Sequence, residues 1–145
     1  MLTQGLSLAA FALLCLTACS EDSGATLSAP DAYARAEAGS LTLIDVRHAE
    51  EWRQTGVAKG ALHIDMTGTQ GEAGFVRQVM RSVGDNLRRP IGLLSRAGNR
   101  AANARDVLRA AGFTEVYVIP EGMQGNGDGP GWIKRGLPVG PCPDC

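Results

Sequence analysis

A chain of 145 residues is long enough for one domain with its own hydrophobic core. Its 14 basic and 15 acidic residues leave a formal net charge of −1, so the composition gives no reason to expect a nucleic acid as partner. The 19 glycines and the scarcity of aromatic residues favour a small α/β domain with many tight turns over an all-β domain.

The chain begins with an apolar segment that resembles a bacterial lipoprotein signal. Residues 6–18 are almost wholly apolar, a run shorter than the about 20 residues of a transmembrane helix but typical of a signal peptide. The run ends in Leu16-Thr17-Ala18-Cys19, which resembles a lipobox and predicts lipidation of Cys19 after cleavage. An ordinary cleaved signal, with Cys19 incidental, is the alternative.

From this pattern we expect a signal peptide over residues 1–18 and a flexible polar tether over residues 19–27. The protein would then be held by its N-terminal lipid on the periplasmic side of a bacterial cell envelope. The membrane would be one of its partners.

The folded domain is predicted to begin with a helix and a buried strand. Residues 28–37 form the helix, because Ser28 suits its N-cap, a proline follows in the first turn and a glycine ends it. The apolar run at 41–46 has the composition of a strand buried on both faces. A short helix over 48–53 and a short strand over 61–64 follow.

The second half continues the alternation of helices and strands. A glycine-rich loop at 68–74 precedes an amphipathic helix, whose apolar residues recur at helical spacing over 75–87. A strand at 116–119 and a glycine-rich loop at 121–131 come last, and we expect this loop to wrap near the functional site. Strands that alternate with helices predict an α/β fold with a parallel sheet.

A strand, a tight loop and a helix are predicted over residues 91–112. Apolar residues form a short run at 91–94, as in a buried strand, and recur at helical spacing over 101–111, where Gly112 can end the helix. The loop between them leads into the helix N-terminus, where several backbone N–H groups lack acceptors within the helix. Those groups and the helix dipole predict a seat for an anion.

The loop itself carries one hydroxyl, one glycine and two cations. Gly98 allows the sharp backbone path, and the arginines add positive charge at both ends of the loop. Ser95 lies at its base. The candidate anion-binding residues are Arg96, Ala97, Gly98, Asn99 and Arg100.

This loop, Ser95-Arg96-Ala97-Gly98-Asn99-Arg100, resembles the active loop Cys-Arg-x-Gly-x-Arg of the rhodanese (thiosulfate sulfurtransferase) family. The segments LIDVRHAEEW, GVAKGALHI and the stretch from Gly112 to Val139 resemble further motifs of the family, in the same order. The resemblance extends over residues 28–139 and leaves residues 140–145 as a tail. It implies a rhodanese-like three-layer domain, with a central parallel sheet flanked by helices.

In that family, the loop cysteine takes a sulfane sulfur from a donor such as thiosulfate and passes the persulfide to an acceptor. Ser95 stands at this catalytic position. A serine hydroxyl stays protonated unless a neighbouring base removes its proton, and oxygen cannot replace the sulfur of a persulfide. The resemblance therefore implies an anion- or partner-binding module, whose partner is a small sulfur-containing anion such as thiosulfate or a persulfide-carrying protein.

Two alternatives retain an active sulfurtransferase. In one, the terminal pair Cys142 and Cys145 supplies the missing thiol; in the other, Ser95 stands in place of a natural cysteine. The pair is otherwise a redox couple, half of a metal site or a simple disulfide. Because neither a second such motif nor a histidine lies near it in the sequence, we expect no metal site, and no cofactor is implied.

A serine hydrolase centred on Ser95 is a further alternative, which would require a histidine base. His48 and His63 are the only candidates, and each is more simply a surface or packing residue. We therefore disfavour hydrolase chemistry.

The remaining polar residues near the predicted site are expected to be structural. Asp45 and Arg47 follow the first buried strand, and we expect an ion pair there, with Glu51 and Trp52 supporting the loop from below. Arg100 is expected to divide its role between anion binding and an internal pair with Asp45 or Glu51.

Overall fold

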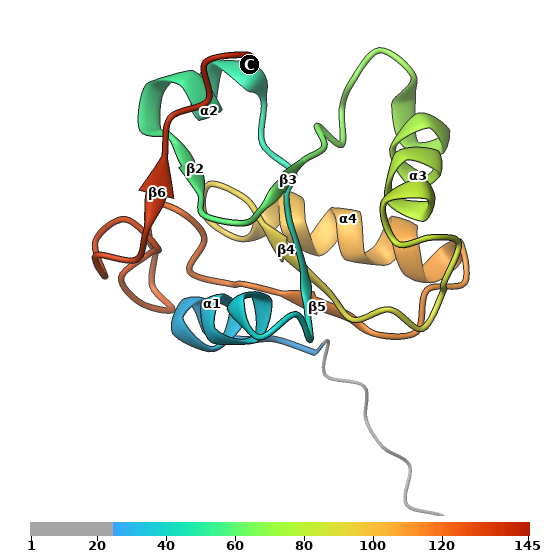
Figure 1. The fold of residues 1–145 in the computed structure, drawn as a ribbon, viewed down its shortest axis with the longest axis horizontal. Helices are drawn as coiled ribbons and strands as arrows, with labels where there is room; N and C mark the ends of the chain where they lie inside the picture. The colour runs from blue at the N-terminus through green and yellow to red at the C-terminus, as the bar shows by residue number, and fades with distance from the viewer. Residues whose placement is uncertain (1–24) are drawn as a thin grey trace, which may run out of the picture.

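A parallel sheet of four strands forms the centre of the fold (Figure 1). The computed structural model describes residues 25–145, so the expected signal peptide, most of the tether, Cys15 and the lipidation site Cys19 lie outside the described residues. The strand order is β3-β1-β4-β5, and every neighbouring pair is parallel. These strands are β1 (Thr42–Asp45), β3 (Leu62–His63), β4 (Ile91–Leu94) and β5 (Val116–Val118).

The helices connect and cover the strands, and their ends follow local sequence signals. They are α1 (Ala29–Glu37), α2 (Ala49–Thr55), α3 (Gly71–Ser82) and α4 (Asn99–Ala110). At the start of α1, the Ser28 hydroxyl accepts the N–H of Asp31 at 3.2 Å, which is the predicted N-cap. Beyond α4, Gly112 has a φ of 100°, as expected of a glycine just after a helix.

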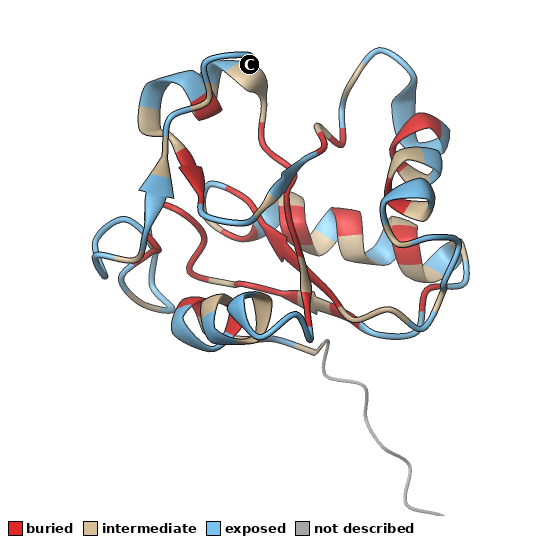
Figure 2. Cartoon of the chain, in the orientation of Figure 1, coloured by how far each residue is buried: buried red, intermediate tan, exposed pale blue. Residues whose placement is uncertain are grey.

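Alternate residues of the central strands pack into two hydrophobic clusters, one on each face of the sheet. Ile44 and Leu93 belong to the cluster that also contains the apolar residues of α3 and α4. Leu43 and Leu94 belong to the other cluster, with α1 and the buried Trp132. Figure 2 shows the central strands buried between these layers. The arrangement confirms the expected α/β fold with a central parallel sheet flanked by helices.

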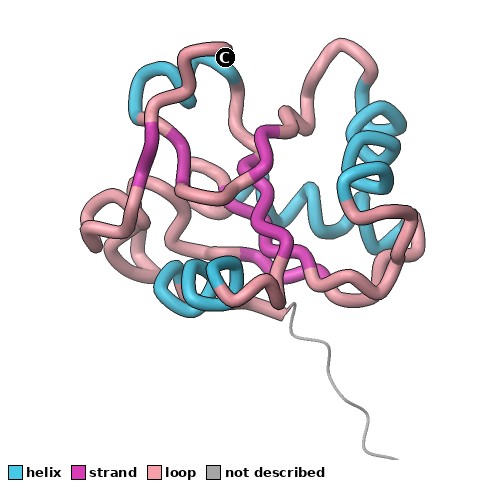
Figure 3. Tube along the Cα trace, in the orientation of Figure 1, coloured by secondary structure: helices cyan, strands magenta, loops and turns pink. Residues whose placement is uncertain are grey.

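A second, two-stranded sheet joins segments that are far apart in the sequence (Figure 3). Strand β2 (Val57–Ala58) pairs in antiparallel fashion with β6 (Val139–Gly140). The expected domain boundary after residue 139 therefore falls inside a strand. The chain beyond β6 ends beside α2, so residues 140–145 lie against the domain (Figure 1).

Helix α3 differs from its predicted position at both ends. It begins at Gly71, inside the segment predicted to be a glycine-rich loop. Residues 71–74 add no large apolar side chain to the periodic pattern, so the sequence did not indicate that they are helical. It ends at Ser82, since Gly84 and Asp85 have φ values of 63° and 58°, which helical residues do not adopt. Leu87 packs against the core from the following loop, not from the helix.

The end of the expected tether also belongs to the fold. The Leu27 N–H donates to the Val118 carbonyl at 2.9 Å, and the Val118 N–H donates to the Ala25 carbonyl at 3.0 Å. Residues 25–27 therefore lie beside β5, so the part of the tether that is described is not free. Within the described range, we find no helix that combines the length and the apolar composition needed to cross a membrane.

Candidate functional site

The predicted loop joins β4 to α4 at the carboxyl edge of the parallel sheet. Leu94, the last residue of β4, is in register with Asp45, and the Val46 N–H donates to the Leu94 carbonyl at 2.9 Å. The loop therefore lies beside the end of β1. This edge is where open parallel α/β sheets bind their ligands.

Ser95 lies in the interior of this loop and is 1% exposed. Its Oγ accepts the N–H of Gly98 at 3.1 Å, so the loop closes around the hydroxyl. The carbonyl groups of Ser95 and Arg96 accept the N–H groups of Met123 at 2.9 Å and Gln124 at 3.0 Å. The loop is thus fixed by hydrogen bonds both within itself and to the segment that follows β5.

Gly98 occupies a position that only glycine fits. Its φ is 90°, and an added Cβ would lie 2.4 Å from the Pro120 carbonyl oxygen. We expect Gly98→Ala to lower the free energy of unfolding by about 2–4 kcal/mol, because backbone strain and steric overlap act together. Urea unfolding measures this change.

The control for that substitution is Gly39→Ala. Gly39 has a similar φ of 71°, but an added Cβ would meet no atom within 4 Å. Its expected cost is the backbone term alone, about 1–2 kcal/mol. Equal costs for the two variants would show that the Pro120 contact yields without penalty, against our expectation.

The first turn of α4 offers several N–H groups to a ligand. Within residues 25–145, the backbone N–H groups of Asn99, Arg100 and Ala101 have no acceptor, and no side chain caps this helix. Because the first N–H groups of a helix carry its positive dipole end, they can bind an anion. The anion seat itself stays a prediction.

The two arginines of the loop have different surroundings. Arg96 is exposed and donates from Nε to Gln124 Oε1 at 2.8 Å, and it has no carboxylate partner in the described part of the chain. Arg100 forms a two-pronged ion pair with Glu51, with both N···O distances at 2.6 Å. The charge of Arg100 is therefore already paired, and Arg96 supplies the unpaired positive charge at the loop.

This ion pair changes the carboxyl group of Glu51. Hydrogen bonding from Arg100 holds the pKa of Glu51 below its ordinary value, against the opposing effect of burial. Glu51 also accepts the backbone N–H of His48 at 3.2 Å, at the start of α2. Glu51 thus ties the loop to α2, and the expected internal pair of Arg100 is confirmed.

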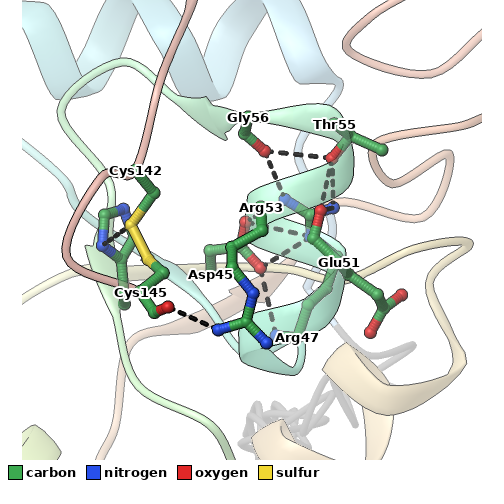
Figure 4. The surroundings of a disulfide bond; sticks show 9 residues. Asp45, Arg47, Glu51, Arg53, Thr55, Gly56, Cys142 and Cys145 are labelled. Carbon is green, nitrogen blue, oxygen red and sulfur yellow. Dashed lines mark hydrogen bonds and ion pairs between the residues drawn. A yellow bond between two sulfur atoms is a disulfide. The ribbon is translucent and has the colours of Figure 1, made fainter.

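The expected ion pair beneath the loop forms between two fully buried side chains. Arg47 donates to both carboxylate oxygens of Asp45 at 2.8–3.0 Å, and the two side chains are 1% and 0% exposed. Arg47 also donates to Thr55 Oγ1 at 2.8 Å and to the Gly56 carbonyl at 2.9 Å (Figure 4). The pair therefore joins the end of β1 to the end of α2.

Neither histidine is placed to activate Ser95. His48 Nδ1 lies 3.0 Å from Asp65 Oδ2 and is shared with Thr67. Burial raises the pKa of Asp65, but the hydrogen bonds from His48 and Thr67 together hold it below its ordinary value. The His63 ring lies against Trp52, with centroids 5.3 Å apart. No serine–histidine pair forms among the described residues, which argues against the hydrolase alternative.

The glycine-rich segment after β5 covers one side of the loop, as expected. Asn126 donates from Nδ2 to the Ala97 carbonyl and to the Pro120 carbonyl, both at 2.9 Å. Sequence reasoning missed Asn126 and Gln124 as residues that hold the loop. The Asn-Gly pair at 126–127 marks a turn, but no local pattern indicates which backbone groups its side chain contacts.

The terminal cysteines form a disulfide, Cys142–Cys145, beside α2 (Figure 4). The Cys142 Sγ lies 3.7 Å from Nδ1 of His63, a residue 79 positions away in the sequence. No histidine is close to this pair in the sequence, but the fold places His63 next to it. The expectation that no histidine lies nearby was therefore wrong for the folded protein.

Comparison with known proteins adds independent information. The family profile described as "Rhodanese-like domain" matches residues 28–126. An uncharacterized protein from Rickettsia conorii is 30% identical over 102 residues, which is 66% of this chain and 80% of the relative.

Two solved structures are similar to this chain at 27% sequence identity. One is the polysulfide-sulfur transferase homodimer from Wolinella succinogenes, with a TM-score of 0.61 over 83% of this chain and 80% of that one. The other is a protein from M. tuberculosis, with a TM-score of 0.59 over 79% of this chain and 95% of that one.

Proposed function

Since this chain belongs to the rhodanese-like domain family, we propose that it is a sulfurtransferase-family domain that binds sulfur-containing anions without forming a persulfide. In this proposal, Ser95 occupies the position of the family's catalytic cysteine. The ligand is a small anion such as thiosulfate, or the persulfide of a carrier protein. The domain then acts as a binding module, not as a catalyst of sulfur transfer.

The loss of persulfide chemistry follows from the atoms at residue 95. Sulfur transfer requires a thiolate that attacks the donor and then holds the transferred sulfur in an S–S bond. The Ser95 hydroxyl faces the Gly98 N–H at 3.1 Å, and both histidines are engaged elsewhere. Without a base the hydroxyl stays protonated, and an oxygen atom cannot form the required persulfide.

The retained anion binding is supported chiefly by the contrast between the two loop arginines. Arg100 is neutralised by Glu51, whereas Arg96 has no carboxylate partner among residues 25–145. The backbone N–H groups of Asn99 and Arg100, three and four residues after Arg96 in the sequence, have no acceptor among residues 25–145. An exposed guanidinium without a carboxylate partner, together with the N–H donors at the start of α4, suits a small divalent anion.

We expect Arg96→Gln to weaken thiosulfate binding about tenfold, because a charge-assisted hydrogen bond is lost. The measurement is an NMR titration that follows the backbone N–H signals of residues 99–101. Arg81→Gln is the matched control, since Arg81 is an exposed arginine on α3. If both variants bind thiosulfate equally well, or if the signals at 99–101 do not move, the anion seat is absent.

A second candidate function is sulfur transfer through the terminal cysteines. His63 is in register with Asp45, which is in register with Leu94, so the disulfide beside His63 belongs to the same sheet edge as the loop. Two strand spacings, about 10 Å, separate the backbones of β3 and β4. This shared edge supports the second candidate, although Cys142 does not contact Ser95.

For location, we propose that the mature protein begins at Cys19 and is held by lipid at the periplasmic face of a bacterial membrane. The supporting observation is the lipobox-like sequence that ends at Cys19. Partition of the mature protein into detergent, and its loss in Cys19→Ser, tests this assignment.

A further inference from the structure

Three metal-binding side chains converge on a site distinct from the loop. The sulfur atoms of Cys142 and Cys145 and a ring nitrogen of His63 all lie within 4.8 Å of one another. We propose that this cysteine–histidine cluster, once its disulfide is reduced, binds one Zn²⁺ ion. The disulfide is then the closed form of a redox-controlled metal site.

The donor atoms suit zinc in kind and in spacing. Two thiolates and one imidazole form a known type of zinc site that leaves a fourth position for water or a ligand. Zn–S and Zn–N bonds of about 2.3 and 2.0 Å hold S and N about 3.5 Å apart in a tetrahedral site. The observed Cys142 Sγ to His63 Nδ1 distance is 3.7 Å. No carboxylate belongs to the cluster, so hard cations such as Ca²⁺ are disfavoured.

The cluster is held by the fold and not only by its disulfide. His63 is fixed on β3 by pairing with Asp45, and its ring packs against Trp52. On the other side, Gly140 of β6 pairs with Val57 of β2. Gly140 lies two residues before Cys142 in the sequence. Breaking the S–S bond therefore leaves the cysteines near His63, because the backbone pairing of β6 remains.

Cys145, the second cysteine of the pair, is also held by a contact with the domain. Arg53, on α2, donates to the carbonyl oxygen of Cys145 (Figure 4). Its guanidinium brings a positive charge close to the cysteines, and a nearby cation favours the thiolate over the thiol. Thiolates are the form of cysteine that binds metal.

Metal binding is coupled to redox state by simple stoichiometry. A dithiol or phosphine reductant supplies two electrons, and with two protons the disulfide becomes two thiols. Zn²⁺ then displaces both thiol protons and forms two Zn–S bonds and one Zn–N bond. The oxidised pair has no thiolate to offer, so it should not bind Zn²⁺ at this site.

The test is a zinc titration of the full chain, competed against a chromophoric chelator, before and after reduction by a phosphine. We expect the reduced protein to bind one more Zn²⁺ per chain than a Cys142→Ser/Cys145→Ser variant. That variant retains Cys15 and Cys19, so it accounts for any metal bound by those residues. The oxidised protein should match the variant.

The role of the histidine is tested by a matched pair of substitutions. His63→Asn should weaken Zn²⁺ binding by at least tenfold, because one of three ligands is lost. His48→Asn should leave binding unchanged, since His48 pairs with Asp65 and asparagine is a good N-cap for α2. His63 is exposed, so its replacement should not unfold the protein.

A spectroscopic signature completes the test. Co²⁺ bound by the reduced protein should show thiolate-to-cobalt charge-transfer absorption that is absent from the oxidised form. The proposal is overturned if reduction adds no bound metal over the double-serine variant. It is equally overturned if His63→Asn and His48→Asn bind Zn²⁺ with the same affinity.

Discussion

Ser95→Cys is expected to form thiocyanate from thiosulfate and cyanide, whereas the chain with Ser95, under our proposal, is not. The cysteine sulfur would lie where Ser95 Oγ now faces the Gly98 N–H, beside the N-terminus of α4. Such surroundings lower a thiol pKa from about 8.5 toward neutrality, so the thiolate is available. Serine and cysteine are close in size, so the substitution should preserve the loop.

The reaction restored in this variant is balanced in two steps. The thiolate attacks the outer sulfur of thiosulfate, the S–S bond to the sulfonate group breaks, and sulfite leaves. Cyanide then attacks the sulfur held on residue 95, thiocyanate leaves, and the thiolate returns. We expect a gain of about 10²-fold or more over the chain with Ser95, because a serine oxygen at residue 95 cannot carry the transferred sulfur.

Two further variants separate the alternatives. Ser95→Ala should be as inactive as the unmodified chain, because the hydroxyl has no catalytic part in our proposal. Turnover by the unmodified chain that disappears in Cys142→Ser/Cys145→Ser would instead assign sulfur transfer to the terminal pair. Turnover by the unmodified chain that survives the double substitution, or a sulfur adduct on residue 95, would contradict our reading of Ser95.

The central part of the site could be predicted from sequence because its signals are local. The apolar run of β4, the loop glycine and the helical pattern of α4 are consecutive, and each signal indicates the same strand–loop–helix unit. The special conformation of Gly98, with a φ of 90°, follows from the same short stretch. The same consecutive signals place Ser95 in the loop between β4 and α4.

The partners of the loop could be predicted only in part, because they depend on tertiary distances. Arg100 was expected to pair with Asp45 or Glu51, and the structure selects Glu51 because Arg47 already binds both oxygens of Asp45. Nothing in the local sequence distinguishes two carboxylates that lie six residues apart on neighbouring elements.

The cysteine–histidine cluster was beyond sequence reasoning for a different reason. It depends on the pairing of β2 with β6, and each of these strands is two residues long. Strands so short carry no alternating pattern, and the pairing joins residues that are more than half the chain apart. The proximity of His63 to Cys142 is therefore a property of the fold and not of any motif.

The largest expected effect on stability comes from the buried pair beneath the loop. We expect Asp45→Asn to lower the free energy of unfolding by about 3–5 kcal/mol, because it leaves the Arg47 charge buried without a countercharge. This loss is a large part of the about 5–15 kcal/mol that stabilises a typical domain. Urea unfolding followed by circular dichroism measures it.

The surface pair Lys59–Glu37 provides the matched control. Its side chains are 58% and 45% exposed, and its N···O distance of 3.2 Å is only slightly longer than that of the buried pair. Glu37→Gln should change the free energy of unfolding by less than about 1 kcal/mol, because water screens exposed charges. The contrast between the two variants isolates burial as the cause.

A double substitution distinguishes lost charge balance from lost hydrogen bonds. In Asp45→Asn/Arg47→Met neither charge of the pair remains buried, so part of the stability lost in Asp45→Asn should return. Full recovery is not expected, because Arg47 also holds Thr55 and the Gly56 carbonyl at the end of α2. If the double variant is less stable than Asp45→Asn, the hydrogen bonds of Arg47 outweigh its charge, and our electrostatic account of this pair is wrong.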